Sequence, residues 1–510
     1  MSQRPRRRRS RSHEADDAPR LDLLASAAWL AGWVVLAVFL LVIFASPLPF
    51  GSNREWAWAP ILMVLGVIGI LCALGLGGAA GFSVAENERW PLLALLICFL
   101  LFTFVGLLQM STDAPHTGSA AFYSRAQSLL GQAHAAVPTL SIDATRNTLL
   151  RCLACVLAFV IARALFREPD RARLLIFAFL LSAVGVMIYA LLQQSYSGGC
   201  YVGSLLKKQG DYTNDRCLMS GTFANSNTFG CFAGMALAAV LALVFQKSRR
   251  KRVVLEEGEE GEDENDGDRF YNRLAGGTMI LLAMALLFVG VQLFSSSRAA
   301  FAVTALVLVA LVYLSMRGRW RSRGEAAKVV VIGVAIGVLV LGIAGGAMLR
   351  KVSLISESGQ FDRTYIWAAS LKAARASPWL GWGLGNFTDI YAVYQPDEIP
   401  QANDKAHSTP IELYVETGIL GTVPGLLMVL IPWAVCLWGA LTRRRQRHLL
   451  VAAFAVPGIA MLHSVVDFSL QIPAIAFISA AFLGMGWAQT FHRTPTPRRI
   501  ERQVFTEDEE

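Results

Sequence analysis

The sequence predicts an all-α membrane protein, a polytopic bundle of about 12 transmembrane helices with one large outside loop. Of its 510 residues, 55% are hydrophobic and only 16% are charged, whereas soluble domains carry about a quarter charged residues. The mean hydropathy is +0.48, which excludes a soluble, disordered or secreted disulfide-rich protein. The apolar residues form continuous runs of roughly 17–25, long enough to span a hydrocarbon core. A β-barrel would alternate instead.

The first apolar run, residues 23–44, follows a basic tail over residues 1–22 that contains Arg6, Arg7, Arg8 and Arg9. The run is too long for a signal-peptide core and lacks a small-residue cleavage site after it. We therefore expect an uncleaved first span, with the arginine run in contact with anionic lipid.

The remaining runs complete a set of twelve spans. They are placed near residues 23–45, 58–78, 90–109, 148–166, 174–194, 226–246, 275–294, 299–316, 328–348, 411–440, 449–467 and 472–490. Nine spans thus occupy residues 23–348, the large outside loop occupies 349–410, three spans occupy 411–490, and a tail follows over 491–510.

Basic residues set the orientation, because cytoplasmic segments carry an excess of Lys and Arg. With the N-terminus inside, 32 of the 46 basic residues are cytoplasmic. Both termini are therefore predicted to be cytoplasmic and residues 349–410 periplasmic. The net charge of +9 follows from this topology, so no nucleic-acid partner is needed to explain it.

Residues 247–273 are predicted to form an acidic cytoplasmic loop. Its stretch Glu256–Asp268 lacks apolar residues, a composition typical of disorder. The loop is interpreted as a solvated linker, with a partner-binding role as the alternative.

Two of the eight cysteines, Cys200 and Cys217, lie in one outside loop. In an oxidising compartment they are expected to form a disulfide. Cys152 and Cys155 have C-x-x-C spacing but lie inside an apolar helix, where they are interpreted as packing residues. No metal or cofactor site is predicted.

The strongest candidate for chemistry is His407. Thr409, Pro410 and Glu412 follow it with the spacing of a helix capping box, so His407 would precede a helix N-terminus. The positive potential there favours a neutral imidazole, as a general base requires, and attracts phosphate. The alternative is a surface histidine at a loop end.

Two arginines are candidates for binding an anion. Arg298 lies in a short outside turn between two spans, and Arg363 opens an amphipathic segment that ends at Ser377-Pro378. The planar guanidinium fork matches two phosphate oxygens. Trp367 follows Arg363 by four residues and shares its helix face. The alternatives are an interfacial anchor for Arg298 and a surface helix for the Arg363 segment.

Weaker candidates lie at other helix ends. Asn225 and Asn227 enter the sixth span, where they could cap the helix or contact sugar hydroxyls. Glu416, His463 and Asp467 are ionisable groups at membrane depth, which are functional candidates by default. For His463 and Asp467, a mutual hydrogen bond that fixes packing is an equal alternative.

Glycines repeat in the segment Gly381-Trp-Gly-Leu-Gly-Asn. The spacing differs from the dinucleotide-binding fingerprint, and no strand precedes it. These glycines are therefore expected to permit a tight turn.

Together these motifs resemble the bacterial O-antigen ligase/polymerase superfamily. His407-Ser408, then nine residues, then Gly418-Ile-Leu-Gly421 is similar to the family's H-[NSQ]-x9-G-x-x-G signature. The lead-in from Arg363 to Phe387, the Arg298 turn and the segment from Gly221 to Asn227 also resemble family segments.

This resemblance implies an inverting, metal-independent glycosyl transfer at the periplasmic face of the bacterial inner membrane. The implied scaffold resembles that of C-type glycosyltransferases. The implied donor is an undecaprenyl-diphosphate-linked glycan, and the acceptor is lipid A-core or another glycan, with membrane lipid around both. Arg298 and Arg363 would bind the diphosphate and His407 would activate the acceptor hydroxyl, with Trp367, Asn225, Asn227 and Glu416 as further substrate-binding residues.

Three functions remain open at this point. A ligase would transfer a finished glycan, and a polymerase would join repeat units; the two share these motifs. A flippase or transporter of lipid-linked sugars would instead place ionisable groups near the bilayer midplane. The candidate charges cluster at the outside boundary, which favours an enzyme.

Overall fold

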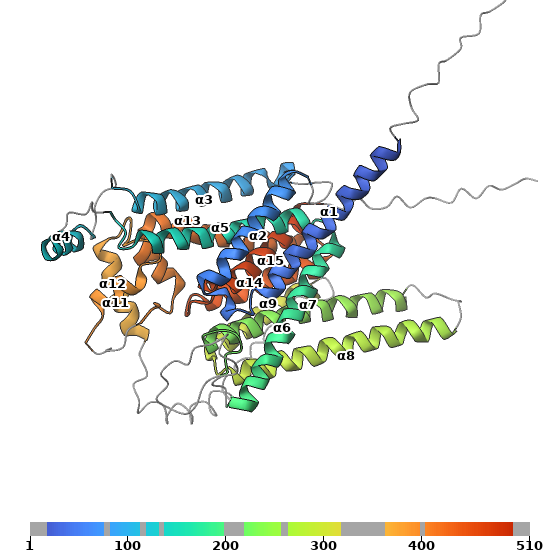
Figure 1. Ribbon diagram of the computed structural model, residues 1–510. Coiled ribbons are helices and arrows are strands. Elements are labelled where there is room, and N and C mark those ends of the chain that lie inside the picture. The colour runs from blue at the N-terminus through green and yellow to red at the C-terminus, as the bar shows by residue number, and fades with distance from the viewer. Residues whose placement is uncertain are drawn as a thin grey trace, which may run out of the picture.

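The computed structural model describes residues 18–75, 82–112, 119–131, 137–197, 219–256, 264–317, 363–397 and 403–492. Throughout these residues the regular structure is helical. Long helices pack into one bundle, and the shorter helices α4, α11 and α12 gather at one end of it (Figure 1). The predicted all-helical, polytopic membrane protein is confirmed.

The structure describes eleven long helices. They are α1 (Ala18–Ala45), α2 (Glu55–Ala73), α3 (Arg89–Gln109), α5 (Ile142–Leu165), α6 (Pro169–Ser197), α7 (Ser226–Glu256), α8 (Glu264–Phe294), α9 (Arg298–Met316), α13 (Thr409–Thr442), α14 (Arg447–His463) and α15 (Pro473–Phe491). The shorter ones are α4 (Ser119–Leu130), α11 (Arg363–Ala376) and α12 (Phe387–Tyr394), with single 3₁₀ turns η1 (Phe50–Ser52), η2 (Glu86–Glu88) and η3 (Ser469–Gln471).

Ten helices within the described residues are long and apolar enough to cross a membrane, and α14 is a shorter apolar helix. Every predicted span in the described residues therefore has a helix. The span predicted at residues 328–348 lies outside them, so the count of twelve stays a prediction.

The centre of the bundle is α15, which is almost wholly buried. Small residues allow its neighbours to approach closely, as is common between membrane helices. A Cβ on Gly484 would lie 2.3 Å from the backbone oxygen of Phe159 on α5. Only glycine therefore permits this contact between α15 and α5.

The segment predicted as an acidic loop over residues 247–273 is helical at both of its ends, which corrects the predicted bounds of the loop. The helix α7 continues to Glu256 and α8 begins at Glu264, so both run on as a long pair (Figure 1). Lys, Arg and Glu are good helix formers, which allows the helices to extend beyond their apolar parts. Residues 257–263 lie outside the described part of the chain.

The cysteine predictions have different outcomes. Cys152 and Cys155 are free thiols inside α5, in agreement with a packing role. Cys200 and Cys217 lie outside the described residues, and their pairing stays a prediction.

The glycine segment forms the tight turn that was expected. Gly381, Gly383 and Gly385 have φ values of 69°, 106° and 82°, a backbone conformation that favours glycine. This turn inserts into a break in α13 at Gly418, whose φ is 56° and ψ is −167°. The Gly383 N–H donates to the Glu416 carbonyl oxygen at 2.9 Å, and the Ile419 N–H donates to that of Pro378 at 2.9 Å. The turn thus bonds the backbone groups around the break.

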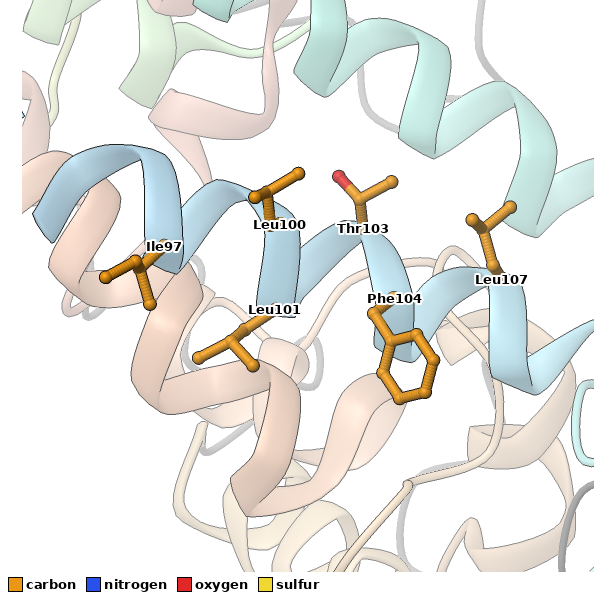
Figure 2. A pocket seen from close by; sticks show the side chains of 6 residues that line it. All are labelled: Ile97, Leu100, Leu101, Thr103, Phe104 and Leu107. Atoms are coloured by element: carbon orange, nitrogen blue, oxygen red, sulfur yellow. The ribbon is translucent and has the colours of Figure 1, made fainter. Parts of the chain in front are cut away.

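An apolar groove of about 540 Å³ runs along α3 (Figure 2). It is lined by Ile97, Leu100, Leu101, Thr103, Phe104 and Leu107. Most of these side chains are exposed, as is expected for a helix face turned toward lipid.

Candidate functional site

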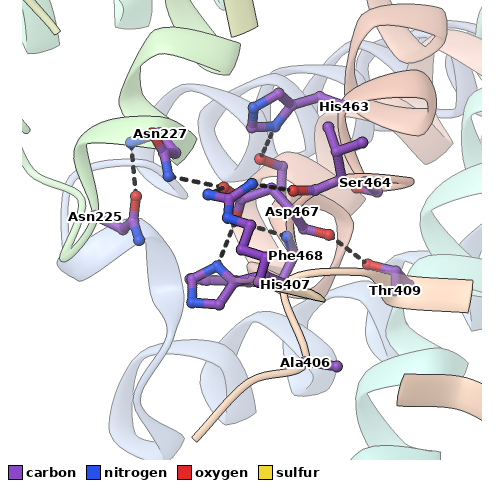
Figure 3. A network of polar contacts seen from close by, with 12 residues as sticks. Asn225, Asn227, Ala406, His407, Thr409, His463, Ser464, Asp467 and Phe468 are labelled. Carbon is purple, nitrogen blue, oxygen red and sulfur yellow. Dashed lines mark hydrogen bonds and ion pairs between the residues drawn. The ribbon is translucent and has the colours of Figure 1, made fainter. Parts of the chain in front are cut away.

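Asp467 is the centre of a polar network that joins four separate segments. Its carboxylate is fully buried. Oδ2 accepts hydrogen bonds from Asn227 Nδ2 at 2.8 Å and from Arg363 Nη2 at 3.3 Å. Oδ1 accepts from the Phe468 N–H at 2.8 Å and lies 3.7 Å from His407 Nδ1. Figure 3 shows Asn227, His407 and Asp467 pointing toward one another.

The short turn after α14 places Asp467 in this position. The helix ends at His463, and the chain turns through Ser464–Phe468 into η3. The Ser464 Oγ accepts a hydrogen bond from the Leu470 N–H at 2.9 Å. The Phe468 N–H donates to the side chain of Asp467, the residue before it. Asp467 therefore faces the N-terminal ends of α7, α11 and α13 instead of continuing the helix.

Asp467 is held in its ionised form. Burial alone would raise the pKa of its carboxyl group. The contact with His407, the nearby His463 ring and the Phe468 N–H outweigh burial, and they hold the pKa of Asp467 below its usual range. A buried carboxylate thus faces the cations and donors around it.

His407 lies directly before α13, as predicted, but its cap differs from the expected capping box. Ser408 is the N-cap residue, and Pro410 is the second residue of the helix. The Thr409 N–H donates to the Ser464 carbonyl oxygen at 2.8 Å. A tertiary contact thus replaces the side-chain cap, and the Glu412 carboxylate is free to bind elsewhere.

The His407 imidazole lies between a carboxylate and an aromatic ring. Its Nδ1 faces Asp467 at a distance somewhat longer than a hydrogen bond, and its ring centroid lies 5.3 Å from that of Phe468. The other ring nitrogen points away from Asp467 (Figure 3). About a quarter of the side chain is exposed, so this second nitrogen can meet a ligand.

Arg363 and Trp367 reach the same place from α11. Besides its bond to Asp467, Arg363 Nη1 donates to the Val466 carbonyl oxygen. Trp367 Nε1 donates to the Ala406 carbonyl oxygen at 2.9 Å. The predicted shared face of these two residues is confirmed, and α11 ends at Ala376, just before Ser377-Pro378.

Asn225 has one of the two roles expected of this pair, the helix cap, whereas Asn227 has a contact that was not expected. Asn225 Oδ1 accepts from the Asn227 N–H at 2.6 Å, so Asn225 caps α7. The Asn227 side chain instead binds Asp467. Asn227 is therefore part of the network, and Asn225 fixes the helix that carries it.

Arg298 is the first residue of α9 and is exposed. A Cβ on Gly230 of α7 would lie 3.1 Å from the Ser297 Cβ, so α9 begins beside the N-terminal part of α7. Among the described residues, no contact joins Arg298 to Asp467. The convergence of Arg298 with Arg363 and His407 stays a prediction.

Glu416 lies one helical turn after Glu412, and it is buried beneath the glycine turn. Its Oε1 accepts from the Phe387 N–H at 3.2 Å, at the N-terminus of α12. In this position Glu416 fixes α12 to α13.

The position of Asp467 differs from the one that its spacing predicted. The spacing of His463 and Asp467 suggested a pair on one helix. In the structure the His463 Nδ1 instead lies 2.8 Å from Ser469 Oγ, and Asp467 lies beyond the helix end. An acidic residue inside an otherwise apolar segment marked Asp467 as a candidate, but this signal did not indicate its partners.

Comparison with known proteins agrees with the expected resemblance. The family described as O-antigen ligase matches residues 282–424, which include Arg298, Arg363 and His407. The exopolysaccharide production protein ExoQ of Rhizobium meliloti (strain 1021) is 29% identical over 221 residues, which is 41% of this chain and 45% of that protein. The chain thus spans less than half the length of this curated relative.

Proposed function

We propose that this multi-pass membrane protein, whose residues 282–424 belong to the O-antigen ligase family, is a glycosyltransferase of polysaccharide synthesis. It transfers a glycan from an undecaprenyl-diphosphate carrier to an acceptor hydroxyl at the periplasmic face of the bacterial inner membrane. The configuration at the anomeric carbon is inverted, and no metal ion takes part.

The observation that carries this proposal is the convergence on Asp467. His407, Arg363 and Asn227 come from segments far apart in sequence, and all three approach one buried carboxylate. A base, a cation and an orienting carboxylate in one place are what acyl- or glycosyl-transfer sites require. Bundle packing alone would not need a partly exposed imidazole there.

In the transfer step, His407 acts as general base. Its outward ring nitrogen takes the proton of the acceptor hydroxyl while the acceptor oxygen attacks the anomeric carbon. The bond from that carbon to the diphosphate oxygen breaks, and its electron pair leaves with the diphosphate. Asp467 orients the ring through Nδ1 and stabilises the imidazolium that forms, as the carboxylate of a catalytic triad does.

The arginines offset the charge of the leaving group. Arg363 uses two of its N–H groups for Val466 and Asp467, and a guanidinium has five. About a third of its side chain is exposed, so the remaining donors can meet phosphate oxygens. Arg298, from the start of α9, is the second cation, because two arginines match a diphosphate better than one.

A polymerase that joins repeat units is the second candidate. Its support is the relative named for exopolysaccharide production, since such polymers are built from repeats. Both functions use the same site and the same transfer step, and they differ in the acceptor.

Deletion of the coding sequence, followed by analysis of envelope glycans, separates the candidates. Loss of surface-attached polymer with long lipid-linked chains retained indicates a ligase. Collapse to single repeat units indicates a polymerase. Lipid-linked glycan that accumulates on the cytoplasmic side would contradict both and indicate a transporter. Complementation with His407→Ala is expected to leave the deletion phenotype unchanged.

A further inference from the structure

Ala406, the residue before His407, has both of its backbone polar groups bound by side chains from other helices. Its N–H donates to Glu412 Oε2 at 2.9 Å. Its carbonyl oxygen accepts from Trp367 Nε1 at 2.9 Å. Ala406 itself is fully buried. Side chains of α13 and α11 therefore fix the backbone one residue before His407.

His407 adopts a backbone conformation that needs such support. Its φ is 50°, in the left-handed region that is disfavoured for a residue other than glycine. Two residues later the Thr409 N–H is bound by the Ser464 carbonyl oxygen. Strained residues persist where contacts on both sides determine them, and His407 has such contacts on both sides.

Glu412 makes one of these two hydrogen bonds, and its burial keeps it away from a substrate. Only 2% of the residue is exposed. Its Oε2 is used by Ala406, and its Oε1 accepts from Lys405 Nζ at 3.0 Å. Burial disfavours the Lys405 ammonium, but Glu412 and Glu416 raise its pKa above the usual value, so the ion pair persists. Both carboxylate oxygens therefore serve the segment that carries His407.

We propose that Glu412 is a positioning residue for His407: through the Ala406 N–H it fixes the left-handed turn that aims the imidazole at the acceptor hydroxyl. This inference rests on the proposed role of His407 as general base. Glu412 contacts neither donor nor acceptor. Its removal therefore affects the transfer step and leaves donor binding intact.

The test measures transfer by the purified full-length protein in liposomes that contain an undecaprenyl-diphosphate-linked glycan. Glu412→Ala is expected to lower kcat about 100-fold, the size of effect that a displacement of about 1 Å produces, with KM within about threefold. Glu412→Gln keeps an oxygen that can accept from Ala406, so its kcat should stay within about fivefold of wild type. The control Asp143→Ala removes an exposed carboxylate paired with Arg146, and it should change neither constant.

A second variant covers the case in which Glu412→Ala does not fold. Trp367→Phe removes the donor to the Ala406 carbonyl oxygen and keeps an aromatic ring. It should lower kcat about five- to tenfold, because a single hydrogen bond is lost. If Glu412→Ala folds with kcat within threefold of wild type, or if it fails to fold and Trp367→Phe leaves kcat unchanged, the proposal is wrong.

A double-mutant cycle separates positioning from a general structural role. With His407→Ala already present, Glu412→Ala should lower the residual rate no further, because residues that act as one unit are non-additive. A further 100-fold loss in that background would overturn the positioning role. If His407→Ala itself keeps transfer, the general-base proposal fails first, and the Glu412 variants then report only on folding.

Discussion

At the scale of single residues, the unusual feature is a charged carboxylate with no solvent exposure near the end of a membrane helix. Removing such a group from water costs several kcal/mol. The structure offsets this cost at Asp467 with an amide, a guanidinium, an imidazole and a backbone N–H. Each donor comes from a different position in the chain, so Asp467 also fixes where they meet.

Asp467→Asn should therefore reduce transfer by about two to four orders of magnitude. The amide keeps the shape of the side chain but cannot stabilise an imidazolium. Donor binding should change little, because Arg363 keeps its bond to the Val466 carbonyl oxygen. The measurement is the rate of transfer in liposomes beside the binding of donor lipid. Asp143→Asn, at an exposed carboxylate, is the matched control. Unchanged transfer by Asp467→Asn would remove this residue from the mechanism.

The sequence could predict His407, Arg363 and Trp367, because their signals are local: a helix start and one helix face. It could not predict that Asp467 contacts Asn227, Arg363 and His407, because its four-residue spacing from His463 implied a continuous helix. The helix ends at His463, which turns the carboxylate toward segments that only the fold brings together. The capping box was wrong for a related reason, because the Ser464 carbonyl oxygen caps Thr409 from outside the local sequence.

At the scale of elements, the break in α13 at Gly418 determines how the short helices α11 and α12 dock. The turn around Gly381 and Gly383 lies in the break. It forms hydrogen bonds with backbone groups of α13 on both sides of the break. Because α11 and α12 flank this turn in sequence, their positions depend on it. Arg363 and Trp367 thus reach His407 from a helix anchored at the break.

Gly418→Ala should destabilise the protein by about 1–3 kcal/mol, the cost of a strained backbone, and should impair transfer. A Cβ there would lie 2.3 Å from the Trp379 backbone. Thermal unfolding in detergent measures the effect. The control Gly66→Ala lies inside α2, where a Cβ would meet nothing within 4 Å, and it should leave stability equal or slightly higher. Equal midpoints for the two variants would show that the break tolerates a side chain.

At the scale of the whole molecule, apolar runs predicted where helices occur, but they could not predict which helix is central. Helix α15 is the least apolar of the ten spanning helices and the most buried, whereas α3 is the most apolar and largely exposed. Helices that face lipid carry large apolar residues, whereas a closely packed central helix carries small residues that let its neighbours approach. The hydropathy of a helix therefore indicates its contact with lipid and does not indicate how deeply it is buried in the bundle.

The bundle should be oriented with residue 397 outside and residue 445 inside. Asp397 and Arg445 are both exposed, and the division of basic residues favours cytoplasmic termini. Asp397→Cys should react with a membrane-impermeant thiol reagent on intact spheroplasts, and Arg445→Cys should react only after lysis. Both proteins carry the same native cysteines, and the parent protein gives the background. The reverse pattern would place the Asp467 network in the cytoplasm and contradict the proposed donor.

The most direct measurement is transfer by the purified protein in liposomes with donor lipid and acceptor, comparing wild type with His407→Ala. The variant is expected to insert, to unfold at a similar temperature and to bind donor lipid as wild type does. Transfer is also expected to fall at least 100-fold, because His407 is the partly exposed base beside Asp467 in the described part of the chain. Transfer by His407→Ala at near the wild-type rate would contradict the general-base role and return His407 to the role of a loop residue before a helix.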